Sequence, residues 1–217
     1  MLESGIRRIM KLQVSFDLSD LEKAVAVAQE VADYAHIIEI GTILIHKYGA
    51  KSVEAFRQAL PNKTLLADTK IADRGAESAT IFAQAGADWI TVMAGTSNEV
   101  IHTACNAAHK ANLKVMLDLI DGCSLGQSAM EAKNLGVNAL LFHQPHDQQD
   151  VPVMLDRWEM VRGNTNLPIF ISAKIKRENI QNILTFKPDG IIVGKAVCDA
   201  ANPREEAQFF YDLVSKQ

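Results

Sequence analysis

The strongest constraint in this 217-residue sequence is a series of eight short apolar segments, each followed by an amphipathic helical stretch. Successive segments begin roughly 22 to 29 residues apart, which is the length of one β-strand plus α-helix unit. No stretch rich in Pro, Gly or Ser interrupts the series. The predicted strands cover residues 12–17, 36–40, 64–70, 88–93, 113–119, 138–143, 167–173 and 189–194.

Eight βα units in unbroken series predict a closed (β/α)8 barrel, the TIM-barrel fold, because right-handed crossovers join successive parallel strands. An open doubly wound sheet is the alternative, and it favours a glycine-rich turn after the first strand. The turn here reads FDLSD and has no glycine, so the barrel is preferred. We expect a single domain over residues 1–217, with residues 1–11 as an N-terminal extension.

Several predicted helices begin at a residue that can cap them. Ser19, Ser97, Ser124 and Asn202 carry side chains that can accept a hydrogen bond from a free backbone N–H of the first helical turn. Pro203 follows Asn202 at the first helical position, where no N–H is needed. We therefore predict these four residues as N-caps.

Composition narrows the classes of function. The net charge is −4 and the Lys and Arg residues are scattered, so neither nucleic acid nor an anionic membrane is an expected partner. No apolar run suggests a membrane span, and the start, MLESGIRRIMK, lacks the apolar core of a secretory signal. Cys105, Cys123 and Cys198 are odd in number and lack CxxC spacing. We expect reduced, buried thiols and a cytoplasmic location.

Polar residues or glycine stand at the C-terminal ends of most predicted strands, where barrels of this fold place their active sites. One such residue alone means little, whereas convergence on one rim predicts a site. The candidates, in chain order, are Asp17, Glu39, Asp68, Lys70, Asp73, Asp118, His143, Ser172, Gly194 and Lys195.

Strand alternation predicts that Asp68 and Lys70 share one face of the third strand, beside Glu39 on the second. Two acids next to a lysine suit an oxygen-liganded cation such as Mg2+. Together, cation and ammonium can stabilise an enediolate, the anion formed next to a sugar ketone. The alternative is an ion-pair cluster that only closes the barrel mouth. For Asp17 and Asp118 taken singly, capping of a loop is an equal alternative.

His143 ends the apolar segment ALLFH, and its location across the rim from the acids predicts a role in proton transfer. Trp89 and Trp158 are expected to pack in the core. The histidines at strand starts and on helices are expected to be structural, namely His36, His46, His102 and His109.

Phosphate is the ligand that barrels of this fold often bind with the loops after the seventh and eighth strands. These loops read SAKIKREN and VGKAVCDAANP. Gly194 lets backbone N–H groups approach an anion, and Lys195 adds a positive charge. For the glycine alone, an ordinary turn is the preferred interpretation.

Three stretches, IIEIGTILIHKYG, LLADTKIAD and VGKAVCDAANPREEA, resemble the orotidine 5′-monophosphate decarboxylase suprafamily. The closer resemblance is to the branch that holds 3-hexulose-6-phosphate synthase and 3-keto-L-gulonate-6-phosphate decarboxylase. It extends from Leu12 to the last predicted helix. The IEIGT and ADTKIAD signatures carry the resemblance, because barrel periodicity is not specific.

The resemblance implies a homodimeric lyase with Mg2+ as cofactor, held by Glu39 and Asp68. It also implies that Lys70 neighbours the reacting carbon and that Asp73 reaches into the active site of the partner subunit. Asp17 would contact substrate hydroxyls.

At the remaining positions the resemblance assigns proton and phosphate handling. His143 matches the histidine that moves protons beside the enediolate, and Gly194 and Lys195 fall where the family binds phosphate. In the seventh-strand loop the family usually has a Gly-Gly pair, and this chain has Ala173 and Lys174, whose Cβ atoms restrict the backbone. Lys174 can instead give the phosphate a positive charge.

Two reactions of this branch pass through the 1,2-enediolate of a pentulose 5-phosphate. The synthase adds it to formaldehyde, and the decarboxylase forms it by losing CO2. Asp118 and His146 favour the synthase, since the decarboxylase has glutamate and arginine there; TKIADRG and the basic Lys195 favour the decarboxylase. We predict the synthase, acting on ribulose 5-phosphate and formaldehyde, with Asp118 and Ser172 among the substrate-binding residues.

Three alternatives to the synthase stay open. The decarboxylase is one, and an isomerase or epimerase on a related barrel, which shares the enediolate chemistry, is another. The third is a non-catalytic barrel that binds a sugar phosphate, which is suggested by the altered seventh-strand loop and by Arg74, where the family usually has a small residue.

Overall fold

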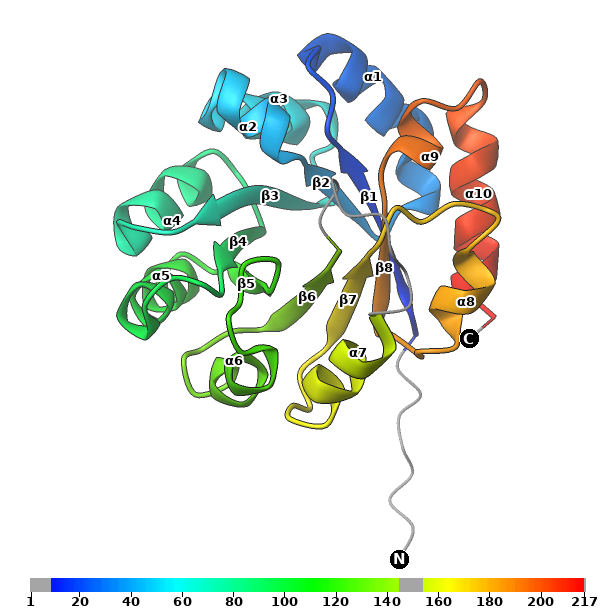
Figure 1. Ribbon diagram of the computed structural model, residues 1–217. Helices are drawn as coiled ribbons and strands as arrows, with labels where there is room; N and C mark the ends of the chain where they lie inside the picture. Colours follow the sequence, from blue (N-terminus) through cyan, green and yellow to red (C-terminus); the bar gives the residue numbers. More distant parts are fainter. Residues whose placement is uncertain (1–8, 145–153, 217) are drawn as a thin grey trace, which may run out of the picture.

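The computed structural model describes residues 9–144 and 154–216 of the chain. Eight parallel strands close into a barrel in the order of the sequence, and helices surround it (Figure 1). The predicted (β/α)8 TIM barrel is therefore confirmed. The strands are β1 (Lys11–Phe16), β2 (Ile37–Ile40), β3 (Thr64–Ile71), β4 (Trp89–Met93), β5 (Lys114–Asp118), β6 (Ala139–His143), β7 (Ile169–Ser172) and β8 (Gly190–Val193).

Each strand begins and ends within two residues of its predicted bounds. The agreement follows from burial, because parallel strands covered on both faces read as nearly continuous apolar runs. In β2 and β8 every residue is buried. In β3 the pairing with β4 shifts between Ala67 and Ile71, so the strand is irregular where Asp68 and Lys70 lie.

Helices connect the strands, and the connections after β2 and β8 each carry two of them. The helices are α1 (Leu21–Val31), α2 (Thr42–Tyr48), α3 (Ala50–Ala59), α4 (Gly75–Gln84), α5 (Asn98–Lys110), α6 (Leu125–Ala132), α7 (Met154–Arg162), α8 (Ile180–Leu184), α9 (Lys195–Cys198) and α10 (Pro203–Val214), with a 3-10 turn, η1 (Ala32–Tyr34), after α1.

The helix starts show which predicted caps form. The side chain of Ser97 accepts the N–H of Val100 at α5, and that of Asn202 accepts the N–H of Glu205 at α10. Ser124 precedes α6 as predicted, without a side-chain cap hydrogen bond. The Ser19 prediction was wrong: α1 begins one residue later, and Asp20 supplies the cap to Lys23. Aspartate, with its charged oxygen, is the better acceptor at a helix N-terminus.

The inside of the barrel changes from apolar to polar along its axis. Its apolar part is one buried cluster, made of Ile37, Leu66, Met116, Ala139, Leu141, Phe170 and Ile192, with Trp89 packed against it. Of the described side chains that are polar and buried, all but Ser52 lie on strands: Gln13, Ser15, Glu39, Asp68, Thr91 and Asp118. Burying a polar group is unfavourable unless it has a hydrogen-bonding partner. These polar side chains therefore indicate a functional region inside the barrel.

The opposite, N-terminal end of the barrel carries four similar hydrogen bonds, which we call the N-terminal clamps. A side chain just before each even-numbered strand accepts a backbone N–H at the start of the preceding strand, at 2.7 to 3.0 Å. A helix residue holds each acceptor. The acceptors and their helix partners are His36 with Tyr211, Asp88 with Arg57, Asn138 with His109, and Asp189 with Arg162.

The three cysteines and the two tryptophans were predicted to be buried. Cys105 and Cys198 are free and buried, and burial raises the pKa of each thiol to about 12. Cys123 is exposed, in the turn after β5, so the prediction that it is buried was wrong. Trp158 packs against Phe142 as an interior residue.

Within the described ranges, none of the helices combines the length and apolar character needed to cross a membrane. Residues 1–8 of the predicted N-terminal extension, and His146, lie outside the described residues.

Candidate active site

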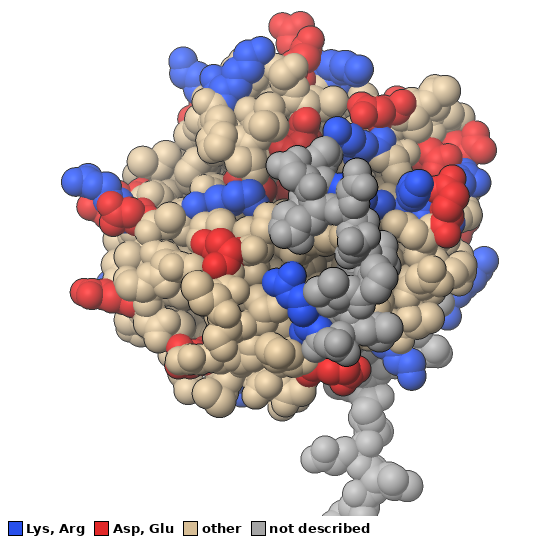
Figure 2. Space-filling view, in the orientation of Figure 1, with Lys and Arg blue, Asp and Glu red and all other residues tan. Residues whose placement is uncertain are grey.

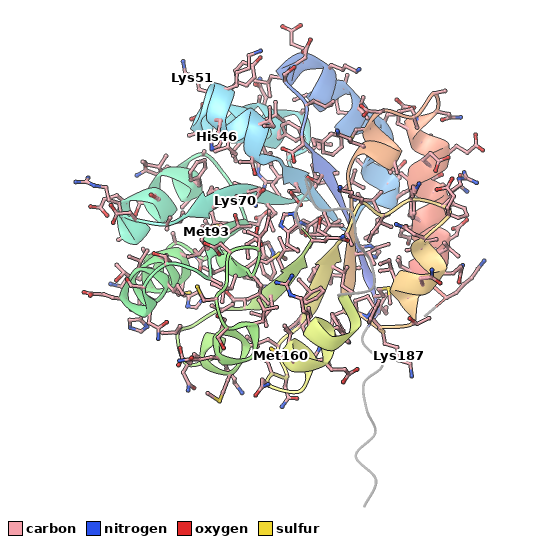
Figure 3. The ribbon with its side chains drawn as sticks, in the orientation of Figure 1. His46, Lys51, Lys70, Met93, Met160 and Lys187 are labelled. Carbon is pink, nitrogen blue, oxygen red and sulfur yellow. The ribbon has the colours of Figure 1, made fainter. Side chains whose placement is uncertain are left out.

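A half-buried lysine links two buried acids at the C-terminal mouth of the barrel. Lys70 Nζ lies 2.7 Å from Asp118 Oδ2 and 3.2 Å from Asp68 Oδ2. Figure 3 shows Lys70 over the strands, inside the ring of helices, whereas Lys187 lies at the edge. His143 completes the group, with its Nδ1 3.1 Å from Asp118 Oδ2. The predicted convergence of strand ends is confirmed for these four residues.

Electrostatics fix the charges of this group. Burial opposes the charged form of Lys70, but the carboxylates of Asp68, Asp118 and Glu39 outweigh it and raise the pKa of the ammonium above its ordinary value. For Asp118, burial favours the neutral acid, but hydrogen bonding and charge from His143, together with Lys70, lower its pKa. Lys70 is therefore a cation and Asp118 an anion at neutral pH.

The backbone of Lys70 is itself unusual. Its φ is 44°, in the left-handed region that residues other than glycine rarely adopt. Thr91 stabilises this conformation, because its Oγ1 accepts the N–H of Lys70 at 2.9 Å and its carbonyl accepts Thr69 Oγ1 at 2.7 Å. Lys70 therefore lies where β3 departs from regular strand geometry, and its side chain still reaches Asp68 and Asp118.

Glu39 and Asp68 form a second acidic pair, on the neighbouring strands β2 and β3. Both are nearly fully buried, at 7% and 5% exposure. Burial, and then the negative charge of Asp68, raise the pKa of Glu39 to about 7. A buried pair of like charges is a site that a cation would stabilise, and Mg2+ typically takes one or two carboxylates and keeps its other ligands as water or substrate oxygens. The two residues therefore fit the predicted metal. Within the described ranges, no group of three or more His, Cys, Asp or Glu residues could hold a metal ion.

Asp17 and Asp73 lie outside the lysine cluster. Asp17, at the end of β1, is exposed and its Oδ1 accepts the N–H of Ile43 at 3.1 Å, near the start of α2. Its carboxylate packs over Gly41, where an added Cβ would come within 2.4 Å of it. Asp73 is exposed on the turn before α4 and accepts the N–H of Arg74; no ion pair joins it to Lys70 within the described residues.

A cavity of about 520 Å3 opens beside the cluster, between β1 and the last two strands. Asp17 lines it, so the structure brings this residue to the cavity as well as to α2. The cavity also brings together most of the residues predicted to bind substrate. Its polar lining includes Ser15, Asp17, His143, Ser172, Lys174, Lys176, Gly194, Lys195 and Asp199.

The loop after β7 keeps a left-handed residue where the family usually has glycine. Lys174 has a φ of 47°, so the added Cβ does not prevent this conformation. Asn179 holds the loop: its Nδ2 donates to the carbonyl of Lys174 at 3.2 Å, and its Oδ1 accepts the N–H of Lys176 at 2.8 Å. Arg74, the other departure from the family pattern, is also left-handed, with a φ of 50°.

Four polar partners in this region were not predicted from the sequence. Gln13, Ser15, Thr42 and Thr91 donate hydrogen bonds to Glu39 or Asp68. The usable signal is a polar residue at an inward position of an otherwise apolar strand, as in LQVSF and WITVM.

The closed barrel and the charged group at its C-terminal mouth define the class of protein, a (β/α)8-barrel enzyme. A family model described as the orotidine 5′-phosphate decarboxylase / HUMPS family matches residues 10–210, and the chain belongs to this family.

Individual relatives cover nearly the whole chain. The 3-hexulose-6-phosphate synthase of Bacillus subtilis (strain 168) is 30% identical over 94% of this chain and 99% of its own. A solved structure of the 3-hexulose-6-phosphate synthase from Salmonella typhimurium is 30% identical, with a TM-score of 0.89 over 95% of this chain and 99% of its own. A 3-keto-L-gulonate-6-phosphate decarboxylase from Vibrio cholerae is 28% identical, with a TM-score of 0.81 over 95% of this chain and 98% of its own. Both named activities break or form carbon–carbon bonds, and the protein is a lyase.

Proposed function

We propose that the protein is a Mg2+-dependent lyase that acts on a ketose phosphate, and that it joins ribulose 5-phosphate to formaldehyde as a 3-hexulose-6-phosphate synthase does. One observation carries the proposal: Lys70 is held as a half-buried cation between the buried acids Asp68 and Asp118, beside His143, which lines the cavity. A fixed ammonium group in that place stabilises an anion that forms on a bound ketose. The relatives named as hexulose-phosphate synthases support this reaction.

Glu39 and Asp68 would hold the cation, as their burial and like charge suggest. When bound, Mg2+ would supply positive charge next to the oxygens of the substrate enediolate. The chain itself would contribute Lys70, whose ammonium group lies 3.2 Å from Asp68.

The addition needs two proton movements and one new bond. A proton leaves C1 of ribulose 5-phosphate to give the 1,2-enediolate, C1 then bonds to the carbon of formaldehyde, and the former formaldehyde oxygen takes up a proton. We assign the proton transfers to Nε2 of His143, because its Nδ1 faces Asp118. Asp118 would orient the ring and stabilise its protonated form, as a buried carboxylate does in other acid–base pairs.

The remaining cavity residues would bind the rest of the substrate. Gly194 lies directly before α9, so its neighbouring N–H groups and the Lys195 side chain suit a phosphate. Lys174 adds charge on the facing loop, and Ser172 lies between them and His143 along the cavity wall. Asp17, directly after β1, also lines the cavity and would contact substrate hydroxyls.

Decarboxylation of 3-keto-L-gulonate 6-phosphate is the second candidate. The similarity to the decarboxylase of Vibrio cholerae and the cationic Lys195 in the cavity favour it. The same lysine cluster would stabilise the same enediolate after CO2 leaves, and His143 would then protonate it.

We further propose that the enzyme is a cytoplasmic homodimer with a site shared across the interface. Asp73 supports the shared site, since it is exposed and outside the cluster of its own chain. Free cysteines are compatible with a reducing compartment. Figure 2 shows acidic and basic side chains interspersed on the face of the molecule that is in view. Such a surface agrees with a small-molecule partner rather than nucleic acid.

The test uses the purified protein with Mg2+, in parallel with ribulose 5-phosphate plus formaldehyde and with 3-keto-L-gulonate 6-phosphate. Consumption of formaldehyde that stops on addition of a chelator supports the synthase, and release of CO2 supports the decarboxylase. If neither substrate is consumed, while ribulose 5-phosphate still raises the thermal unfolding temperature, the protein is a binding barrel and both lyase assignments fail.

A further inference from the structure

Both carboxylate oxygens of Glu39 are occupied by uncharged donors from the neighbouring strand β1. Gln13 Nε2 donates to Oε2 at 2.5 Å, and Ser15 Oγ donates to Oε1 at 2.7 Å. Gln13 is fully buried and Ser15 is 7% exposed. The carboxylate is therefore fixed in its plane from one side, while the second lone pair of each oxygen is left for another ligand.

Asp68 is held in the same way from its other neighbours. Thr91 Oγ1, on β4, donates to Oδ1 at 2.8 Å, and Thr42 Oγ1, at the start of α2, donates to Oδ2 at 2.5 Å. Four uncharged side chains thus take one lone pair on each of the four oxygens of the two acids. Uncharged donors orient a carboxylate without cancelling its charge. Lys70 Nζ also lies 3.2 Å from Asp68 Oδ2, so Asp68 has a cationic neighbour in addition to its two threonines.

The hydrogen bond from Gln13 to Glu39 leaves the other end of the Gln13 amide in an unfavourable place. With Nε2 directed at Glu39, Oε1 of the amide is buried and has no hydrogen-bond partner among the described residues. Gln13 lies two residues before Ser15 on β1, and the residues beside it on the neighbouring strands are Ile37 and Ile192. An unpaired buried carbonyl is unfavourable, so an apolar residue would suit packing better. The glutamine is therefore explained by what it does to Glu39.

We propose that Gln13, Ser15, Thr42 and Thr91 are positioning residues that hold both carboxylates in the arrangement that binds the divalent cation. The inference rests on the proposed function, since it takes Glu39 and Asp68 as the metal ligands. Partners that orient metal ligands typically change metal affinity 10- to 100-fold when removed. None of the four residues needs to touch the substrate for this role.

The test measures Mn2+ binding to the full-length protein by electron paramagnetic resonance, which does not depend on turnover. Ser15→Ala, Thr42→Val and Thr91→Val each remove one hydroxyl with little change in volume, and Gln13→Met replaces the amide with an apolar chain of similar length. Each is expected to weaken Mn2+ binding about 10-fold or more. Thr42→Ser and Thr91→Ser keep the hydroxyl and are expected to bind Mn2+ within a few-fold of the wild type.

Ser52→Ala is the matched control, because Ser52 is also a fully buried serine but donates to the carbonyl of Gly49 in another part of the fold. It should leave Mn2+ binding unchanged. Unaltered Mn2+ affinity in all of the hydroxyl deletions, with weaker binding in Glu39→Gln, overturns the positioning role and leaves the metal site standing. Unaltered affinity in Glu39→Gln overturns the proposed metal site itself. If Thr91→Val does not fold, Thr42→Val decides the question, because Thr42 is only half-buried.

Discussion

The two ends of the barrel use polar side chains in opposite ways. At the N-terminal end, the four clamps join side chains to backbone N–H groups, and three of the four acceptors are held by an arginine or histidine of a helix. At the C-terminal end, Glu39 and Asp68 bring like charges together in a buried place. Lys70 and Lys174 there adopt left-handed conformations that favour glycine.

The polar side chains at the N-terminal end of the barrel stabilise the fold, whereas those at the C-terminal end serve the reaction. Hydrogen bonds to otherwise free backbone groups stabilise the closed barrel, and they recur at every second strand because the fold itself repeats. A buried pair of like charges is unfavourable on its own, so its presence at the C-terminal end indicates a function that requires it. Substitutions at the two ends should therefore change different quantities.

The largest effect is expected for Lys70→Ala at the C-terminal end. Removal of the cation between Asp68 and Asp118 should lower kcat by about 10²- to 10³-fold or more, the usual effect of deleting one group that stabilises a developing anion. The far-ultraviolet circular dichroism spectrum should stay that of the folded protein. An unchanged rate would remove Lys70 from the mechanism.

Arg57→Ala is the opposite change, at the N-terminal end. Arg57 donates to four backbone carbonyls and to Asp88, so its loss should lower the free energy of unfolding by about 2–4 kcal/mol. Activity per folded molecule, measured well below the unfolding temperature, should not change. A variant that lost activity while keeping its stability would break the division between the two ends. Arg57→Lys should recover little, because an ammonium cannot reproduce the guanidinium fork.

Two left-handed lysines, one at each end of the barrel, can be changed to glycine. Lys174 and Lys187 have φ values of 47° and 51°, so glycine should relieve the same strain and stabilise either site by up to about 1 kcal/mol. Lys187 is exposed near the N-terminal end and should affect nothing else. Lys174→Gly should also raise KM for the phosphorylated substrate roughly 10-fold, because a charge leaves the cavity. Equal KM values for the two variants would exclude Lys174 from substrate binding.

The smallest effect is expected for the pH dependence of stability, through the N-terminal clamp at His36. Burial, and then the charges of Lys11 and Lys63, lower the pKa of His36 below 6.5 in the fold, where Nδ1 accepts the N–H of Leu12. The contribution of His36 to stability is therefore complete above pH 6.5 and is lost as the pH falls through the lower folded value.

His36→Asn should keep the acceptor and remove this pH dependence, since Asn138 fills the same place before β6. Denaturant unfolding of the wild type and the variant at about pH 7.5 and about pH 5.5 measures the pH dependence of the free energy of unfolding. Identical pH dependence in the wild type and the variant would show that His36 does not titrate in this window.

The sequence allowed the barrel to be predicted because its strands are buried on both faces, so each appears as an apolar run, and most of the runs end in a polar residue or glycine. Asp68, Lys70, Asp118 and His143 could be placed together for the same reason, since parallel strands put their C-terminal ends on one rim. Neither inference needed side-chain geometry. The roles of Asp17, Asp73 and the phosphate residues remain predictions.

Features that depend on side-chain geometry could not be predicted. The left-handed turn at Lys70 depends on the hydroxyl of Thr91, which is 21 residues away in sequence. The N-terminal clamps pair residues from different strands and helices, so single positions such as His36 showed only that they lie at a strand start. The Cys123 prediction failed because exposure within a turn follows from the packing around it and not from residue type.

The most direct test is a crystal structure of the protein soaked with Mg2+ and ribulose 5-phosphate. We expect one cation bound between the carboxylates of Glu39 and Asp68, with the sugar phosphate extending along the cavity toward Lys195. A cation bound elsewhere, with the sugar phosphate absent from the C-terminal mouth, would contradict it.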